Sequence, residues 1–237
     1  MTEYTIHPLI VGSNETDQGV MTYLKGYGNR IWIPIYVFYV AGGEKKILVD
    51  TGLDQFVVPP EVGEQNGVEI LEFEDALAKV DLEPEDVDII IHTHLHNDHC
   101  ENDYKCTNAK AYVQRGELEF FEDPHPLDHR YYPDLLDDVE VVTVDGEAEI
   151  VDGIQVVPSP GHTPGTQSVL IQTSQGRVGI AGFCCNQENF PEKGPAVTPG
   201  VHTDALAAYD SIQRFREMAD ILLPLHDFSV GQRKQIP

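Results

Sequence analysis

The feature that most limits the fold is a run of histidines and acidic residues that directly follows an apolar segment. The apolar segment VDIII leads into HTHLHNDHC at 92–100. Alternate side chains of an extended chain share a face, so His94, His96 and Asp98 can converge on one point. His99 then turns toward a second point. Histidine and carboxylate groups are ligands for zinc, iron and manganese. The run therefore predicts a metal site at the end of a buried strand, with room for two adjacent ions.

Two further histidines occupy similar settings later in the chain. His162 lies in SPGHTPG after an expected strand at 154–157, and His226 lies in LLPLHDF after the last expected strand. Turn-forming residues bracket both positions. Together with the first cluster, they count as candidate metal ligands. His92 is expected to point away from the metals, beneath the loop.

The pattern of apolar residues predicts a mixed fold in which strands outnumber helices. The segment 31–50 predicts two strands around a turn at Gly42 and Gly43. Helical patterns cover 72–82 and 204–219. Further strands are expected at 87–91, 111–113, 140–144, 154–157, 167–172, 178–181 and 220–224. Dispersed helices around many strands favour a sheet sandwich with helices outside over a doubly wound sheet.

Length and composition predict one globular domain. The chain has 237 residues, of which 41% are hydrophobic, and this is enough to bury one large core. We therefore treat residues 1–237 as a single domain. Within it, the segment 122–138 (EDPHPLDHRYYPDLLDD) is rich in proline, aromatic and charged residues. It is expected to form a long ordered loop that could serve as a lid.

The charge of the chain limits its partners. Forty acidic residues against 15 basic ones give a formal net charge of −25, which repels phosphate backbones and anionic membrane surfaces. We therefore expect a small-molecule substrate, no nucleic acid and no membrane partner, and we leave a homodimer open. A cytoplasmic location is predicted because the polar N-terminal segment does not resemble a signal peptide and no apolar run is long enough to span a membrane. Four cysteines are also too few for a disulfide framework.

Four short segments together resemble the metallo-beta-lactamase superfamily, and they occur in that superfamily's order. They are VDTG at 49–52, THLHNDH at 93–99, PGHTPG at 160–165 and PLHD at 224–227. Within the superfamily the chain is most similar to the N-acyl-homoserine lactonase-like branch. The segments LEPEDVDIIIHTHLHNDHCEN, GHTPGTQSVLI and PGVHTDALAAYDSI carry that similarity.

The resemblance implies an α/β fold, an αββα sandwich, with two divalent metal ions at the edge between two sheets. Zinc is the expected metal, with iron or manganese as alternatives. The implied ligands are His94, His96 and His162 for the first ion, and Asp98, His99 and His226 for the second. Asp50 in VDTG either orients these ligands or serves as a turn-forming residue. His202 in PGVHTD either faces the pocket or flanks the N-terminus of the helix that follows.

One ligand of the family has no counterpart here. In the family an aspartate at a strand end bridges the two metals, but this chain reads GIAGFCCN at 179–186, which places Gly182 or Phe183 at that position. Neither side chain can bind a metal. Three alternatives stay open: Cys184 is a metal ligand, Cys185 is, or neither is. Cys185 also lies near the position of a tyrosine with which the lactonase branch stabilises its tetrahedral intermediate.

The function implied is that of a metal-dependent, dinuclear hydrolase that attacks a lactone, ester or thioester carbonyl. A metal-bound hydroxide would be the nucleophile, and Asp98 would be the catalytic residue that orients it. Two alternatives remain: an iron-dependent oxidoreductase of the same fold, and a degenerate member that binds a ligand without catalysis.

Overall fold

The computed structural model describes residues 2–237 and contains two β-sheets. The strands of the first sheet, in spatial order, are β1 (Thr5–Asp17), β2 (Arg30–Ala41), β3 (Ile47–Val49), β4 (Ile89–Ile91), β5 (Lys110–Gln114) and β6 (Glu140–Val144). Those of the second are β11 (Ile221–Leu223), β10 (Gly176–Ile180), β9 (Gln167–Thr173), β8 (Ile154–Pro158) and β7 (Ala148–Val151). In the first sheet, β3, β4, β5 and β6 run parallel to one another.

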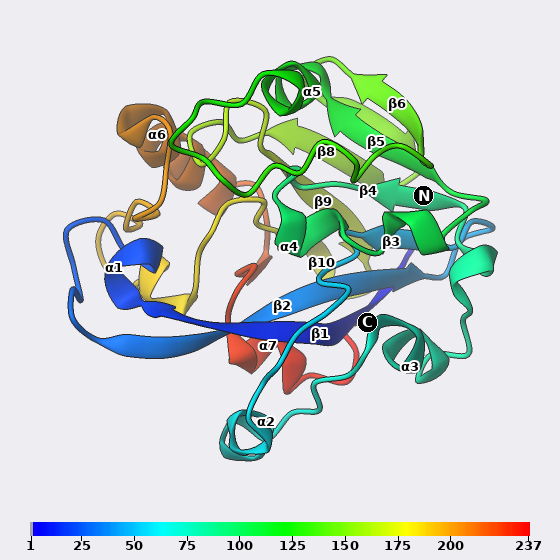
Figure 1. Ribbon diagram of the computed structural model, residues 1–237, viewed down its shortest axis with the longest axis horizontal. Coiled ribbons are helices and arrows are strands. Elements are labelled where there is room, and N and C mark those ends of the chain that lie inside the picture. The colour runs from blue at the N-terminus through cyan, green and yellow to red at the C-terminus, as the bar shows by residue number, and fades with distance from the viewer. Residues whose placement is uncertain (1) are drawn as a thin grey trace.

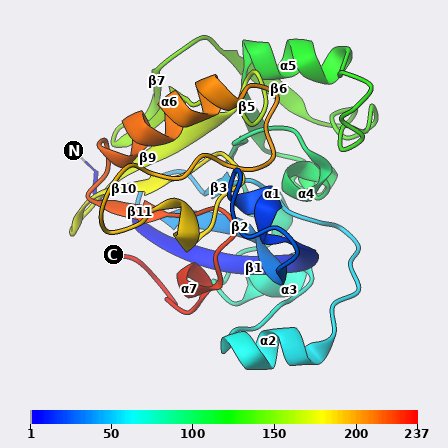
Figure 2. The same cartoon turned by 90° about the vertical axis from the view of Figure 1, so that its left-hand side faces the viewer.

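Helices lie on both outer sides of the two sheets (Figures 1 and 2). They are α1 (Gln18–Met21), α2 (Pro60–Asn66), α3 (Phe73–Ala78), α4 (Asn97–Cys100), α5 (Arg115–Glu122), α6 (Ala205–Arg216) and α7 (Phe228–Gly231). Three 3₁₀ turns span Pro84–Asp86, Asp103–Lys105 and Gln187–Asn189. None of the helices in the described residues is long and apolar enough to cross a membrane. The expected αββα sandwich is confirmed.

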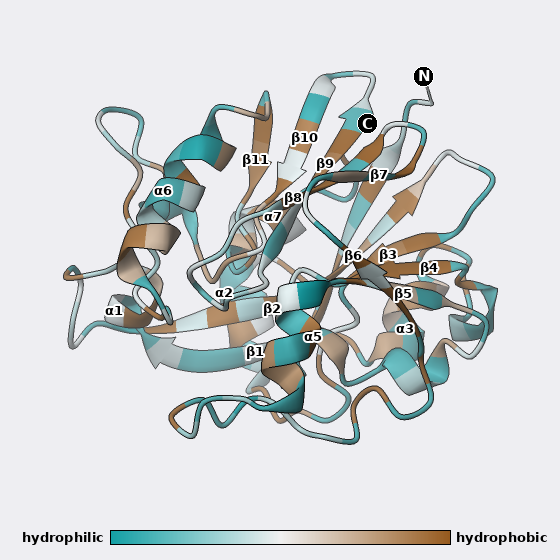
Figure 3. Ribbon diagram, turned by 90° about the horizontal axis from the view of Figure 1, so that it is seen from above, coloured by the Kyte–Doolittle hydropathy of each residue, from teal (hydrophilic) through white to brown (hydrophobic). Residues whose placement is uncertain are grey.

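The main hydrophobic core lies between the sheets and follows from the alternation of side chains along each strand. In β4, Ile89 and Ile91 face the core between the sheets, whereas Ile90 faces outward and packs with Phe73 of α3. On the other side, Phe215 of α6 packs in a cluster on the outer face of the second sheet. Figure 3 shows the hydrophobic colour on central strands such as β3 and β4. Because of this alternation, α3 packs on the outer face of the first sheet and α6 on the outer face of the second.

Most predicted elements are present, but the first strand was missed. The hairpin at 31–50 is β2 and β3, which pair antiparallel, and its turn contains Gly42 with a φ of 121°. The longest strand, β1, had no counterpart in the prediction, nor did β7, α2 or α5. In β1, burial alternates only from Thr5 to Ile10, and the register with β2 shifts between Ile10 and Ser13. A bulged strand of this kind is defined by its partner rather than by its own periodicity.

Candidate metal centre

Six side chains gather in two groups of three around the loop that follows β4. The two groups are His94, His96 and His162, and Asp98, His99 and His226. In each group the potential ligand atoms all lie within 4.8 Å of one another. The loop after β4 and the short helix α4 supply four of the six, and the loops that follow β8 and β11 supply one each. The structure thus brings together the six residues in the two sets that the sequence resemblance implied.

Hydrogen bonds to the backbone fix two of these rings. His162 Nδ1 donates to the carbonyl oxygen of Val201 at 2.9 Å, and His226 Nδ1 donates to the carbonyl oxygen of Pro34 at 2.9 Å. A ring that donates from Nδ1 keeps a lone pair on Nε2. Both Nε2 atoms therefore face the cluster as potential ligand atoms, as the histidines of metal sites do.

The nitrogens of the first group are spaced as metal ligands are. His94 Nδ1 donates to Thr93 Oγ1 at 3.0 Å, and His94 Nε2 lies 3.2 Å from His162 Nε2. Two lone pairs at this distance repel unless a cation lies between them. Nitrogens bound at about 2.05 Å to one tetrahedral zinc ion lie roughly 3.3 Å apart. The residues present therefore fit a divalent metal ion.

Burial keeps most of these rings neutral, as metal ligation requires. It lowers the pKa of His94 and His162 well below the ordinary value of histidine, and that of His226 to about 4. His99 differs: burial lowers its pKa, but the carboxylates of Asp98 and Asp50 outweigh this and raise it overall. The second group contains the only carboxylate among the six candidate ligands, that of Asp98.

Asp50 holds the loop that carries the ligands. Its carboxylate accepts hydrogen bonds from the Thr93 amide and hydroxyl, both at 2.7 Å, and from His99 Nδ1 at 2.9 Å. Burial alone would raise the pKa of Asp50, but the His99 and His92 rings lower it to about 2. Its φ of 58° is an unusual conformation for a residue other than glycine. These contacts match the orienting interpretation of Asp50, which touches a candidate ligand without joining either group.

His92 points away from both groups, as expected. Its Nε2 lies 2.7 Å from Asp103 Oδ2. Burial lowers the pKa of His92, but Asp103 and Asp50 raise it more, to about 10. The His92 ring thus lies between two buried carboxylates beneath the loop that carries the candidate ligands.

The residues at the position of the family's bridging aspartate cannot replace it. A Cβ atom at Gly182 would overlap the carbonyl oxygen of Gln167. The Phe183 ring packs against Phe215 of α6, with the ring centres 6.2 Å apart. The described residues therefore place no carboxylate side chain at this strand end.

The two adjacent cysteines point in different directions. Cys184 lines the same cavity as the candidate ligands, but it belongs to neither group of three, and its Sγ lies 3.6 Å from Met21 Sδ. Burial raises the pKa of its thiol to about 12. Cys185 packs in the apolar cluster with Phe183 and lies outside the cavity. Its link to the centre is its carbonyl oxygen, which accepts from the His226 amide at 2.9 Å.

His202 does not line the cavity. Its Nδ1 lies 2.9 Å from the carbonyl oxygen of Pro199, and its ring meets the edge of Tyr23 with ring centres 4.9 Å apart. It therefore belongs to the segment that leads into α6, in line with the second of its two interpretations.

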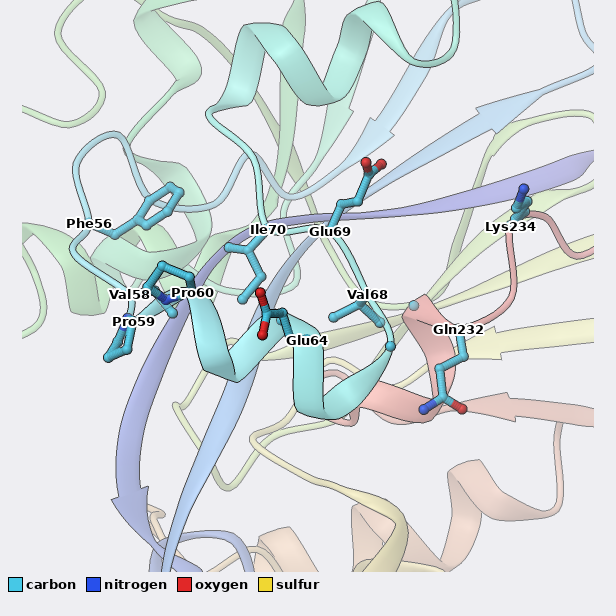
Figure 4. A pocket seen from close by; sticks show the side chains of 13 residues that line it. Phe56, Val58, Pro59, Pro60, Glu64, Val68, Glu69, Ile70, Gln232 and Lys234 are labelled. Carbon is cyan, nitrogen blue, oxygen red and sulfur yellow. The ribbon is translucent and has the colours of Figure 1, made fainter.

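The cavity at the two groups has a volume of about 340 Å³. Besides the six candidate ligands, its lining includes an apolar wall made by Val20, Ile33 and Val201. A larger cavity of about 780 Å³ lies between α2 and the C-terminal segment (Figure 4). It contains none of the candidate ligands, and we do not assign the chemistry to it.

Sequence reasoning missed three residues that support or line the site. Arg130 lines the cavity, Asp128 lies 3.1 Å from His96 Nε2, and Glu117 accepts a hydrogen bond from the Leu95 amide at 2.9 Å. The first two lie in the expected lid, 122–138. Only Arg130 could have been noticed in the sequence, because it is the only Lys or Arg in that acidic segment.

The fold and the two histidine groups define a class of metal-dependent hydrolases. Residues 30–182 match the family described as the metallo-beta-lactamase superfamily, and the chain belongs to this superfamily. Within it, several relatives are lactonases. The chain is 31% identical over 206 residues to N-acyl homoserine lactonase AiiA of Bacillus thuringiensis subsp. kurstaki, and the match covers 81% of this chain and 78% of the relative. A Bacillus cereus N-acyl homoserine lactonase is 29% identical over 209 residues, with the same coverage.

Solved structures give the same result. One is an N-acyl homoserine lactone hydrolase with the product N-hexanoyl-L-homoserine bound at its catalytic metal centre. It has a TM-score of 0.77 and 26% identity, and the match covers 97% of this chain and 96% of that one. A quorum-quenching N-acyl homoserine lactone lactonase has a TM-score of 0.75 and 29% identity, with 97% and 94% covered. The chain is thus a metallo-hydrolase of the lactonase-like branch that acts on ester-type bonds.

Proposed function

We propose that the protein is a dinuclear hydrolase that opens the ring of N-acyl homoserine lactones or related lactones. The observation that carries this proposal is that two complete groups of three ligands line one cavity. His94, His96 and His162 would hold one divalent ion. Asp98, His99 and His226 would hold the other. We propose zinc for both, since imidazole and carboxylate ligands with open positions are typical of catalytic zinc sites.

The chain's own residues position the reaction. Divalent ions bound here would lower the pKa of a water molecule and polarise the substrate carbonyl. The Asp98 Oδ2 atom lies 3.7 Å from His99 Nε2, and an Asp98 oxygen that faces the cavity can accept a hydrogen bond from the attacking water and so orient it. His94 and His162 would use the lone pairs of their Nε2 atoms to hold the metal ion, so Asp98 would accept the proton of that water.

The cavity fits a substrate with one polar and one apolar part. Its volume lies near the lower end of the roughly 300–1,000 Å³ that ligand pockets span. The candidate ligands form a polar side, and Val20, Ile33 and Val201 form an apolar side. An acyl chain beside a lactone ring has this division, as do simple esters and thioesters. The iron oxidoreductase alternative is not favoured, because it relies on a bridging aspartate for which Gly182 leaves no room. A homodimer and a cytoplasmic location remain predictions.

Removal and return of metal test the proposed function. The protein stripped with a chelator is expected to hydrolyse no lactone, ester or thioester, and activity should return with about two zinc ions per chain. The measurement is elemental analysis alongside hydrolysis of N-hexanoyl homoserine lactone, a chromogenic ester and a thioester. Protein that holds two zinc ions and turns over none of the three would contradict the proposal. Oxygen consumption by the iron-loaded protein would support the oxidoreductase instead.

The role of Cys184 as a ligand is tested separately. If its thiolate completes one metal site, Cys184→Ser should weaken binding of one of the two ions by about tenfold or more. Metal-edge anomalous maps of the wild type should then place a sulfur about 2.3 Å from that ion. Cys106→Ala is the control, because Cys106 packs among the residues under α3. Two fully occupied ions in Cys184→Ser, with no sulfur near either, would show that Cys184 only packs beside the centre.

A further inference from the structure

Arg130 is the only Lys or Arg among the described residues that line the metal cavity. It lies in the segment between α5 and β6. Its carbonyl oxygen accepts a hydrogen bond from the Asn97 amide at 2.9 Å, which ties it to the start of α4. The side chain is 37% exposed and is part of the cavity lining. The proposed ligand sets give it no function.

Two of the three guanidinium nitrogens of Arg130 donate hydrogen bonds to a single carboxylate, that of Asp128. Arg130 Nε donates to Asp128 Oδ1 at 2.8 Å, and Nη2 donates to Asp128 Oδ2 at 2.7 Å. Asp128 Oδ2 also lies 3.1 Å from His96 Nε2, so one carboxylate fixes both the arginine and a candidate ligand. Nη1 has no partner among the described residues, and its two N–H groups are free to donate.

The neighbouring residue fixes this part of the lid to the metal loops. The Tyr131 hydroxyl donates to Glu117 Oε1 at 2.8 Å, and the Tyr131 ring meets the edge of His96 with centres 4.8 Å apart. The Glu117 carboxylate also accepts from the Leu95 amide and from the Thr163 hydroxyl. These contacts fix the segment of Arg130 against the loops that carry His96 and His162 before any ligand binds. A hydrogen-bond donor that is positioned in advance stabilises a transition state more strongly than one that must first reorganise.

The charge of Arg130 lies in the same cavity as the six candidate ligands. A fixed cation beside two cation sites disfavours further positive charge and favours a negatively charged ligand atom. An arginine with a free N–H pair is well suited to a carboxylate or to another oxyanion.

We propose that Nη1 of Arg130 binds the negative oxygen that forms from the substrate carbonyl and then the carboxylate of the product. This inference rests on the proposed function. Water adds to the carbonyl carbon, the ring C–O bond breaks, and the ring oxygen takes one proton from that water. The second proton is released as the new carboxyl group ionises. Arg130 thereby supplies, from the lid, the donor that the strand end at Cys185 lacks.

Binding of a simple carboxylate tests the inference without any turnover. Hexanoate is titrated calorimetrically into zinc-loaded wild type, Arg130→Gln, Arg130→Lys and Arg115→Gln. Arg115 is a matched control: it makes the same paired contacts with Asp145, at 2.7 and 2.8 Å, but lies outside the cavity. We expect Arg130→Gln to bind hexanoate at least about tenfold more weakly than the wild type does. Arg130→Lys should keep part of the affinity, and Arg115→Gln should bind hexanoate as the wild type does.

Hydrolysis of N-hexanoyl homoserine lactone by the same samples separates the two proposals. Arg130→Gln is expected to lower kcat by about 100-fold with little change in KM and full zinc content. Equal hexanoate affinity in wild type and Arg130→Gln, or no hexanoate binding by the wild type, would overturn the inference. Loss of zinc in Arg130→Gln would also overturn it, since Arg130 would then only support His96. Hexanoate binding through Arg130 without turnover by the wild type would remove the proposed function and leave the inference standing.

Discussion

Asp98→Asn is expected to lower kcat for lactone hydrolysis by roughly 1000-fold, because asparagine keeps the shape of aspartate but loses its charge. In the native protein the carboxylate faces three buried rings, and although burial raises the pKa of Asp98, the His99, His226 and His96 rings lower it overall. A neutral amide can neither balance a divalent ion nor accept a proton from the attacking water. The measurement is steady-state kinetics on the zinc-loaded variant, with metal content determined on the same sample.

The control for this prediction is Asp75→Asn, which alters an exposed carboxylate in the first turn of α3. It should retain wild-type kcat and both ions. We expect Asp98→Asn to lose one ion in addition to its activity, while thermal unfolding of the metal-free proteins stays comparable. A kcat within tenfold of the wild type, with both zinc ions present, would show that Asp98 neither binds metal nor orients water.

The contiguous part of the site could be predicted from the sequence because local chain geometry determines it. Once VDIII is taken as a buried strand, the segment that follows has to place its histidines at the end of that strand. The finer expectation, that Asp98 converges with His94 and His96 while His99 turns away, was wrong. Asp98 and His99 both lie in α4 and share the second group. His162 and His226 could be placed because each follows a strand end. Hydrolase chemistry then followed from the residue types and the family resemblance.

The residues that support the site could not be found this way. Asp128 contacts His96 across 32 positions of sequence, and Glu117 contacts Thr163 across 46. Such contacts depend on how α5 and the segment 122–138 fold back over the loop that follows β4, and no local pattern encodes that. Arg130 was visible only as an isolated basic residue in an acidic segment. The first strand was missed for a related reason, because β1 owes its length to pairing with β2.

In the segment GFCC at 182–185, a close backbone contact explains why position 182 is a glycine. The sequence indicated a lost carboxylate and left open whether a thiol replaces it. The structure shows that Gly182 lies against β9: its amide donates to Ser168 Oγ at 3.0 Å, and a Cβ would meet the carbonyl oxygen of Gln167. The glycine is required by this close approach and not by an unusual φ. Any side chain at this position has to move the backbone of one strand.

Gly182→Ala is therefore expected to lower the free energy of unfolding by about 3 kcal/mol, because the added methyl group has no space to occupy. The measurement is urea denaturation of metal-free protein, with the m value checked for constancy.

Gly116→Ala is the matched control. Its Cβ would meet nothing closer than 3.8 Å, and in helix α5 it should be neutral or stabilising by up to about 1 kcal/mol. A loss below about 1 kcal/mol for Gly182→Ala would mean that the strands can separate, and an aspartate could then be restored at this position. A loss of the expected size would mean that packing of β9 against this strand end excludes the bridging carboxylate, so the two proposed ions would bind without it.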